Sequence, residues 1–273
     1  MKINILKKTY GSNIILEKLR FTIDQKGSIA LVGLNGSGKS TLLKVISGIC
    51  QNYTGDIDLE SRKIASLIDG WGYYRFYTGR EMMEYLLTDD EIVAAQEYLD
   101  VFKVRSYLDN KFYKYSLGMK QRLALVCTFA KKSDLLLLDE PINGLDPEGI
   151  SDFKNIITKL KKEKTIIIST HILTDISSYC DQVFVLENHS LQSHVFEGNA
   201  FRFAFDNEED ALKLSKLMGD NCKSDVTDKI LVATIKDDYF RKIIKLIAEN
   251  SLSINSIDKV SNSIDYNLLE KIW

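Results

Sequence analysis

The first third of the chain carries short apolar runs separated by polar residues, a pattern that predicts β-strands. Such runs occupy Ile3 to Leu6, Ile14 to Leu16 and Leu19 to Ile23, and they are rich in the residues that strands favour. Ser28 to Gly33 is a nearly continuous apolar run that ends in glycine and predicts a buried strand. From Ser40 onward the apolar positions recur every three or four residues, so a helix is expected there.

The middle of the chain changes from strands to helices and then alternates between them. Gly55 to Leu59 and Lys63 to Ile68 predict a hairpin, and helical spacing prevails between Trp71 and Ala130. Leu135 to Leu138 is an unbroken apolar run that suits a strand covered on both faces. The elements expected next are a helix at Ile150 to Leu160, a strand at Thr165 to Ser169, another helix, and a strand at Gln182 to Leu186. This order predicts a parallel α/β sheet.

After about residue 200 the order of elements restarts. Strands are predicted at Phe201 to Phe205, Ile230 to Ile235 and Leu252 to Ile257, with helices at Ala211 to Met218 and Phe240 to Ile247 and a closing helix that ends at Trp273. We therefore expect one domain over residues 1–200 and a small α+β accessory domain over residues 201–273.

Composition narrows the classes of function. The 36 Lys and Arg residues against 38 Asp and Glu leave a net charge of −2, so a surface that neutralises nucleic acid is not expected. The four cysteines lie far apart and form no CxxC pair, which favours a reducing compartment. The first ten residues are unlike a signal peptide, and no apolar stretch approaches the roughly 20 residues that cross a bilayer. Any role at a membrane is therefore expected to need a partner chain.

A glycine-rich stretch lies between the buried strand and the first helix. Its sequence, Gly33-Leu34-Asn35-Gly36-Ser37-Gly38-Lys39-Ser40-Thr41, matches G-x-x-x-x-G-K-[ST]. Glycines let backbone N–H groups point at phosphate oxygens, Lys39 adds positive charge at the β- and γ-phosphates, and the Ser40 hydroxyl can bind Mg²⁺. A flexible Gly/Ser linker is the alternative, but such a match arises by chance in only about one chain in a hundred. The stretch predicts a nucleotide site.

Two acidic residues, Asp139 and Glu140, end the Leu-rich strand. If this strand runs beside the strand that leads into the phosphate loop, Asp139 reaches the metal and Glu140 faces the attacking water as general base. An acidic turn that only caps the strand is the alternative, and it would be favoured if the two acids stood alone. The phosphate loop about 100 residues upstream favours the catalytic interpretation.

Four further segments complete a recognisable order. Ser116 to Arg122 reads Ser-Leu-Gly-Met-Lys-Gln-Arg, Asn143 to Pro147 reads Asn-Gly-Leu-Asp-Pro, Ser169 to His171 reads Ser-Thr-His, and Tyr10 precedes the phosphate loop. Each alone has an ordinary explanation: a helix cap, a solvated histidine or a packed tyrosine. Together they resemble the signature, the D-loop, the switch histidine and the adenine-stacking aromatic residue of the ATP-binding subunit of ABC transporters. The resemblance covers nearly all of the chain up to about residue 200.

This resemblance implies a fold and a reaction. The fold is the α/β P-loop NTPase core of the ABC type, with a β-rich N-terminal subdomain, a parallel sheet, an inserted helical subdomain at about 72–130 and the C-terminal α+β appendage. The cofactors are ATP and Mg²⁺, with Ser40 and Asp139 at the metal. Glu140 and His171 are the catalytic residues of ATP hydrolysis.

The resemblance also implies partners and a location. Two ATP-binding subunits, identical or different, bind head to tail, with ATP between Lys39 of one copy and Ser116, Gly118 and Asp146 of the other. The helical subdomain grips a separate transmembrane permease. The protein is then cytoplasmic and peripheral on the inner face of the plasma membrane, with no nucleic-acid partner.

The signature departs from the family consensus at three positions. Leu117 stands where the first glycine is usual, Met119 replaces glutamine, and Tyr115 replaces the leading leucine. This variant resembles the subgroup that exports peptide antibiotics and other drugs or confers self-immunity.

Two other segments resemble the same subgroup. In the segment that ends at Asp69, the subgroup has glutamate in place of the family's Q-loop glutamine, and the shorter Asp69 is here the expected metal ligand. The closing residues Ser263 to Ile272 resemble the subgroup's Leu-Glu-x-x-Phe ending.

Proteins of other classes share parts of this pattern. A translation-associated ATPase normally carries two such cassettes in one chain, and a DNA-repair ATPase carries a long coiled coil; neither feature occurs here. A small-molecule kinase shares the phosphate loop but not the segment Ser116 to Arg122. A sensor or immunity component without net transport remains open, because the ATPase residues do not show which way cargo moves.

Overall fold

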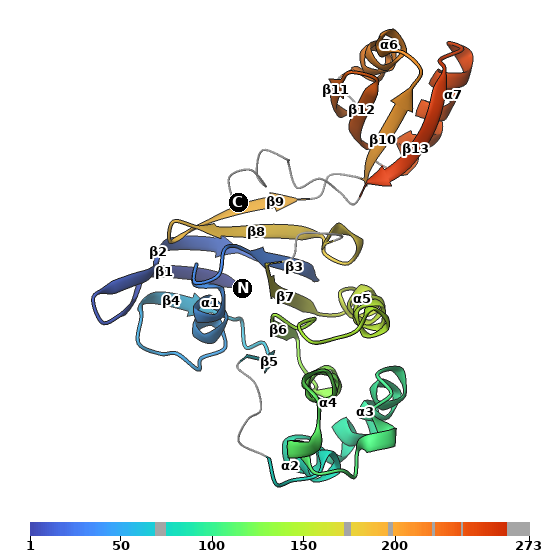
Figure 1. Ribbon diagram of the computed structural model, residues 1–273. Helices are drawn as coiled ribbons and strands as arrows, with labels where there is room; N and C mark the ends of the chain where they lie inside the picture. Colours follow the sequence, from blue (N-terminus) through green and yellow to red (C-terminus); the bar gives the residue numbers. More distant parts are fainter. Residues whose placement is uncertain (69–74, 172–175, 196–198, 220–221, 236, 261–273) are drawn as a thin grey trace. The chain divides into compact units, whose positions relative to one another are not determined.

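The computed structural model describes residues 1–68, 75–171, 176–195, 199–219, 222–235 and 237–260. The chain divides into two compact units, which are coloured along the sequence in Figure 1. Unit 1 comprises Met1–Ile172 and Tyr179–His194, and unit 2 comprises Leu173–Ser178 and Val195–Trp273. None of the helices in these described ranges is long and apolar enough to cross a bilayer.

Unit 1 begins with a three-stranded antiparallel sheet. Its strands are β1 (Lys2–Tyr10), β2 (Asn13–Thr22) and β4 (Thr54–Asp58), in the order β2-β1-β4. The two short strands expected between residues 14 and 23 are one strand. The pattern had suggested a break because Lys18, in the middle of β2, has φ 53°, which interrupts the alternation of side chains without ending the strand.

The second sheet of unit 1 has six strands in the order β5-β6-β7-β3-β8-β9. These strands are β5 (Ile64–Leu67), β6 (Leu135–Asp139), β7 (Thr165–Thr170), β3 (Gly27–Val32), β8 (Gln182–Glu187) and β9 (Ser190–Val195). The neighbouring pairs from β5 to β8 are all parallel, as predicted for the α/β core.

Two expectations about strand neighbours are wrong. The predicted hairpin does not form, because β4 pairs with β1 whereas β5 pairs with β6 in the other sheet. The Leu-rich strand β6 does not run directly beside the phosphate-loop strand β3, because β7 pairs with both and lies between them. In this register Asp139, Ser169 and Leu31 lie level with one another across the three strands.

The helices of unit 1 begin at residues suited to capping. The helices are α1 (Lys39–Ile46), α2 (Gly79–Leu86), α3 (Asp89–Val101), α4 (Leu117–Ala130) and α5 (Pro147–Leu160), and 3-10 turns cover Arg105–Tyr107 and Phe112–Lys114. Thr78 and Glu81 form a capping box at the start of α2. The helix expected between β7 and β8 is represented, among the described residues, by the 3-10 turn Ile176–Ser178.

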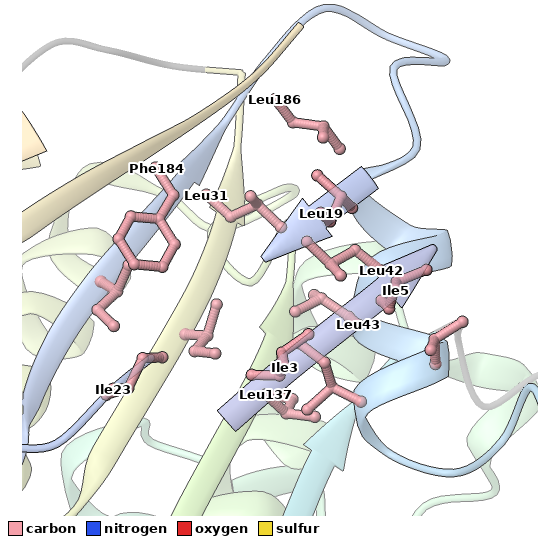
Figure 2. Close-up of a cluster of buried hydrophobic side chains, with 14 of the residues drawn as sticks. Ile3, Ile5, Leu19, Ile23, Leu31, Leu42, Leu43, Leu137, Phe184 and Leu186 are labelled. Atoms are coloured by element: carbon pink, nitrogen blue, oxygen red, sulfur yellow. The ribbon is translucent and has the colours of Figure 1, made fainter. Parts of the chain in front are cut away.

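The main core of unit 1 lies where α1 and the two sheets meet, as Figure 2 shows. Ile3 and Ile5 of β1, Leu42 and Leu43 of α1, and Leu137 of β6 are each at most 1% exposed. Burying such side chains stabilises the fold by about 1.5–3 kcal/mol each. This packing holds α1 in place, and with it the loop that joins β3 to α1.

In its described residues, unit 2 is an α+β fold with four antiparallel strands and two α-helices. In chain order it contains β10 (Asn199–Phe205), α6 (Glu208–Met218), β11 (Lys223–Thr227), β12 (Ile230–Ile235), α7 (Asp237–Glu249) and β13 (Ile254–Val260). The sheet order β11-β12-β10-β13 with this βαββαβ succession is the ferredoxin-like topology. Phe203, Leu214, Leu231 and Ile243, all 0% exposed, belong to its own core.

Candidate functional site

The phosphate loop spans the link from β3 to α1. Gly36 and Gly38 have φ 82° and 104°, a region that favours glycine. A Cβ on Gly38 would also lie 2.9 Å from Ile15 Cγ2. Asn35 and Gly36 are exposed and Ser40 is half-buried. The first turn of α1, which includes Ser40 and Thr41, presents backbone N–H groups that have no acceptor within the helix and can bind an anion.

Lys39 is folded back onto this loop. Its Nζ donates to Gly33 O at 2.7 Å and to Leu34 O at 3.0 Å, and the residue is 6% exposed. Burial lowers the pKa of the Lys39 ammonium, whereas the charges of Glu140 and Asp139 act to raise it. The lysine thus lies within electrostatic reach of both acids, which come from a strand two positions away in the sheet.

Asp139 and Glu140 are held by Ser169 of the intervening strand β7. Ser169 Oγ donates to Asp139 Oδ1 at 2.5 Å and accepts from the Glu140 backbone N–H at 2.9 Å. The Glu140 N–H also donates to Ser169 O at 3.2 Å. Nothing in the sequence pattern singled out Ser169 by itself, because its role depends on β7 lying beside β6.

His171 lies against Glu140. Its Nδ1 is 2.9 Å from Glu140 Oε2, and the side chains of His171 and Glu140 are 43% and 22% exposed. Glu140 has φ 47°, which breaks the alternation of side chains along β6. The two acids therefore face partners at the carboxyl end of β7: Asp139 faces Ser169 in the strand, and Glu140 faces His171, which directly follows the strand. Lys39, Asp139, Glu140 and His171 form one cluster.

A second cluster joins the start of α4 to the turn before α5. Ser116 caps α4 and accepts from Met119 N at 3.2 Å. A Cβ on Gly118 would lie only 2.6 Å from Gly144 O, so the two backbones are in close contact. Gly144 has φ 82° and faces Leu117. The signature-like and D-loop-like segments thus touch within one chain.

Gln121 and Arg122, to which the sequence pattern assigns no separate role, connect the segments of this second cluster by hydrogen bonds. Gln121 Nε2 donates to Pro141 O at 2.7 Å, and Arg122 donates to Phe102 O at 2.9 Å and to Asp146 Oδ1 at 2.6 Å. The same Asp146 oxygen caps α5 by accepting from Gly149 N. The Gly149 N–H and the Arg122 guanidinium lower the pKa of the Asp146 carboxyl. Asp146 is therefore a helix cap, whatever it contributes to nucleotide binding.

The remaining predicted residues lie elsewhere. Tyr10 ends β1, is 50% exposed, and has Lys8 Nζ 4.4 Å from its ring centroid. Asp69 lies outside the described residues, as does the closing segment from Ser263, so the structure says nothing about either. Figure 1 shows α4 beside α2 and α3, in a different part of unit 1 from α1.

The residues present fit a nucleoside triphosphate with a divalent cation. Within the described part of the chain, the buried Ser37 Oγ has no hydrogen-bond partner, as expected of a loop shaped around a ligand. The Lys39 ammonium and the amides of the first turn of α1 suit phosphate oxygens. The oxygens of Ser40 and Asp139 are the ligand type that Mg²⁺ prefers.

Comparison with known proteins agrees with this chemistry. The ABC transporter family profile matches residues 16–143. The chain is 34% identical to the lantibiotic transport ATP-binding protein SrtF of Streptococcus pyogenes, over 73% of this chain and 92% of that protein. It is 32% identical to the bacitracin transport ATP-binding protein BcrA of Enterococcus faecalis, over 70% and 67%. An uncharacterized ABC transporter ATP-binding protein of Bacillus subtilis, YdbJ, is 25% identical over 95% of this chain and 91% of its own.

Solved structures share the fold. An ATP-binding subunit of an ABC transporter superposes with a TM-score of 0.66 at 26% identity, over 80% of this chain and 94% of that one. A dimeric ATP-binding cassette in a post-hydrolysis state, bound to ADP and Pi, has a TM-score of 0.60 at 22% identity, over 72% and 99%. The match to SrtF and these structural likenesses lead to one conclusion: the chain belongs to the ABC transporter family, as an ATP-binding subunit that hydrolyses ATP.

Proposed function

We propose that this chain uses Mg²⁺-dependent ATP hydrolysis to drive a separate transmembrane permease that exports, or confers immunity to, an amphipathic peptide or drug. The observation that carries the chemistry is the cluster of Lys39, Asp139, Glu140 and His171 at the carboxyl ends of neighbouring strands. The names of SrtF and BcrA, which concern lantibiotic and bacitracin transport, support the class of cargo.

Each residue of the cluster takes one role. Lys39 and the amides of the phosphate loop hold the β- and γ-phosphates, and Ser40 and Asp139 provide oxygens for the metal. Mg²⁺ supplies charge neutralisation between the phosphate oxygens when it is bound. His171 holds Glu140 Oε2, so Oε1 is the atom we assign to the proton of the attacking water. Asp69, if its loop brings it to the metal, adds one further carboxylate.

The composite site is completed by a second subunit. Ser116 and Gly118 lie at the exposed N-terminal end of α4, and this helix is not beside the phosphate loop of its own chain. A head-to-tail dimer, with an identical or a second ATP-binding subunit, would bring them to the opposite nucleotide. Asp146, which Arg122 of α4 holds next to them, would come with them. Tyr10 would stack on the adenine. The helical subdomain from about 72 to 130 would contact the permease and hold the protein at the inner face of the membrane.

A resistance assay tests the cargo separately from the chemistry. A strain lacking this chain should become more sensitive to lantibiotic-type peptides or bacitracin, and the wild-type chain, but not Lys39→Ala, should restore resistance. The proposed cargo would be refuted if deletion of the chain left the sensitivity to these antibiotics unchanged, while the wild-type chain in the parent strain purified together with its permease. Restoration by Lys39→Ala would instead favour a sensor or immunity role without transport.

A further inference from the structure

Ser169 is a buried hydroxyl group between the two acidic residues of the site. It is 0% exposed and lies near the carboxyl end of β7, with β6 on one side and β3 on the other. Its Oγ donates its one proton to Asp139 Oδ1 and accepts the Glu140 backbone N–H. A serine hydroxyl has one donor proton and lone pairs to accept with, so both groups are bonded in the correct sense.

The two bonds fix different things. The bond to Oδ1 orients the Asp139 carboxylate and leaves Oδ2 as the oxygen directed elsewhere. The bond from the Glu140 N–H holds the backbone where Glu140 enters the left-handed region, at φ 47°. A residue with a side chain adopts this region only when its surroundings enforce it. Without that conformation, alternation along the strand would point Glu140 away from Asp139 and from His171.

The end of β7 supplies both supports, since Ser169 lies in the strand and His171 follows its last residue. Each contacts one member of the pair, Asp139 or Glu140. His171 therefore holds the end of the Glu140 side chain, while Ser169 holds its backbone and the neighbouring carboxylate.

We propose that Ser169 is a positioning residue for ATP hydrolysis: its hydroxyl sets the metal-facing oxygen of Asp139 and the turned backbone of Glu140 together. This inference rests on the proposed roles of Asp139 and Glu140. Because the Ser169 hydroxyl bonds to Asp139 and to the backbone of Glu140, its removal should disturb metal binding and turnover without weakening the binding of nucleotide alone.

The test compares three variants with a matched control. Ser169→Ala removes the hydroxyl, Ser169→Cys replaces it with a weakly hydrogen-bonding thiol of similar volume, and Ser169→Thr keeps a hydroxyl. The control is Ser28→Ala. Ser28 is also 0% exposed and in the same sheet, but it lies near the amino end of β3, where its hydroxyl donates to Tyr179 O at 2.6 Å. The Ser28 hydroxyl also donates to Asp181 Oδ2 at 3.2 Å, so Ser28→Ala likewise removes buried hydrogen bonds, but not ones to Asp139 or Glu140.

Two measurements decide the outcome. The Mn²⁺ affinity of the protein–ATP complex, followed by electron paramagnetic resonance, should fall about tenfold in Ser169→Ala and Ser169→Cys, as loss of a hydrogen bond to a charged group implies. The kcat for MgATP should fall at least as much. Affinity for ATP with EDTA present should stay within about twofold of the wild type. Ser169→Thr should keep most of the wild-type Mn²⁺ affinity and kcat, and Ser28→Ala should lower only the Tm.

Other results would overturn the inference. Wild-type Mn²⁺ affinity and kcat in Ser169→Ala, or equal effects of Ser28→Ala and Ser169→Ala, would make Ser169 purely structural. Asp139→Asn and Glu140→Gln separate this failure from failure of the proposed function. If those variants lose metal affinity and turnover while Ser169→Ala does not, only the role of Ser169 is wrong. If they too are unchanged, the proposed roles of the acids fail.

Discussion

Single residues in this site depend on partners far away in the sequence. Glu140 is turned by its own backbone conformation and held by His171, 31 residues further along the chain. Its carboxylate is only partly exposed, and the Lys39 ammonium is close enough for their charges to interact. Because Glu140 is partly buried, water and salt screen its charge less than that of a surface carboxylate. Such a placement suits a general base better than a surface ion pair.

Glu140→Gln should keep ATP binding and stop turnover. The amide cannot take a proton from water, so kcat should fall by about 10²–10⁴-fold, the usual loss for a general base. ATP should then accumulate on the protein, which size-exclusion chromatography with labelled nucleotide would detect as a dimer. Glu148→Gln is the matched control, because Glu148 is an exposed acid paired with Lys103. Near-wild-type kcat in Glu140→Gln would remove Glu140 from catalysis.

The sequence predicted the residues that belong to local motifs and not those that support them. The phosphate loop could be predicted because its residues are contiguous and lie between a strand and a helix. Ser169, Gln121 and Arg122 bond to groups 20 to 30 positions away, in part to backbone atoms. Such bonds depend on which strands are neighbours, and no periodic pattern encodes that.

Secondary-structure elements show the same division. The buried strand β6 and the helix α5 were predicted to within about three residues of their observed ends, because a continuous or helical apolar pattern identifies them. The partners of β4 and β5 were wrong: closeness in sequence suggested a hairpin, yet each strand completes a different sheet. β9 and β11 were missed, since neither carries the strong apolar run that marks the other strands.

Gly118→Ala should damage the joint between α4 and the turn before α5. Its new Cβ would lie 2.6 Å from Gly144 O, a backbone atom, and such overpacking costs about 1–3 kcal/mol. Gly149→Ala is a suitable comparison, because its Cβ would meet side-chain atoms of Asp146 and Arg122 at 3.0 and 3.3 Å, which have more room to adjust.

Urea unfolding and ATPase measurements would compare the two glycine variants. We expect Gly118→Ala to lower both the free energy of unfolding and the rate of hydrolysis, and Gly149→Ala to change either only slightly, helped by the better helix propensity of alanine. Equal and small effects of both substitutions would show that the joint adapts to a methyl group at no cost.

At the scale of the whole molecule, the described residues of unit 1 and those of unit 2 each form a hydrophobic core. The first core joins β-strands and α1 of unit 1, and the second joins the strands and helices of unit 2. The restart of the pattern near residue 200 predicted a second domain over residues 201–273. It did not predict the ferredoxin-like order of unit 2, because strand order depends on pairing and not on succession.

Phe203→Ala should destabilise unit 2 alone. Phe203 is 0% exposed within that core, and such truncations cost about 3–5 kcal/mol. Differential scanning calorimetry should show one transition moving to lower temperature, while the transition that ATP raises stays in place. ATP affinity should be unchanged. If Phe203→Ala lowers both transitions together, the two units unfold as one.

The order of strands in unit 2 has a mechanical consequence. Within its described residues, the first and last strands, β10 and β13, are antiparallel neighbours, and Ala200 of β10 pairs with Val260 at the end of β13. Tension applied through the chain at these two ends would pull the strands apart from one edge, breaking one hydrogen bond after another. Strands loaded along their length must instead break many bonds at once. Unit 2 should therefore unfold at low force, with the hydrogen bonds between β10 and β13 breaking one after another.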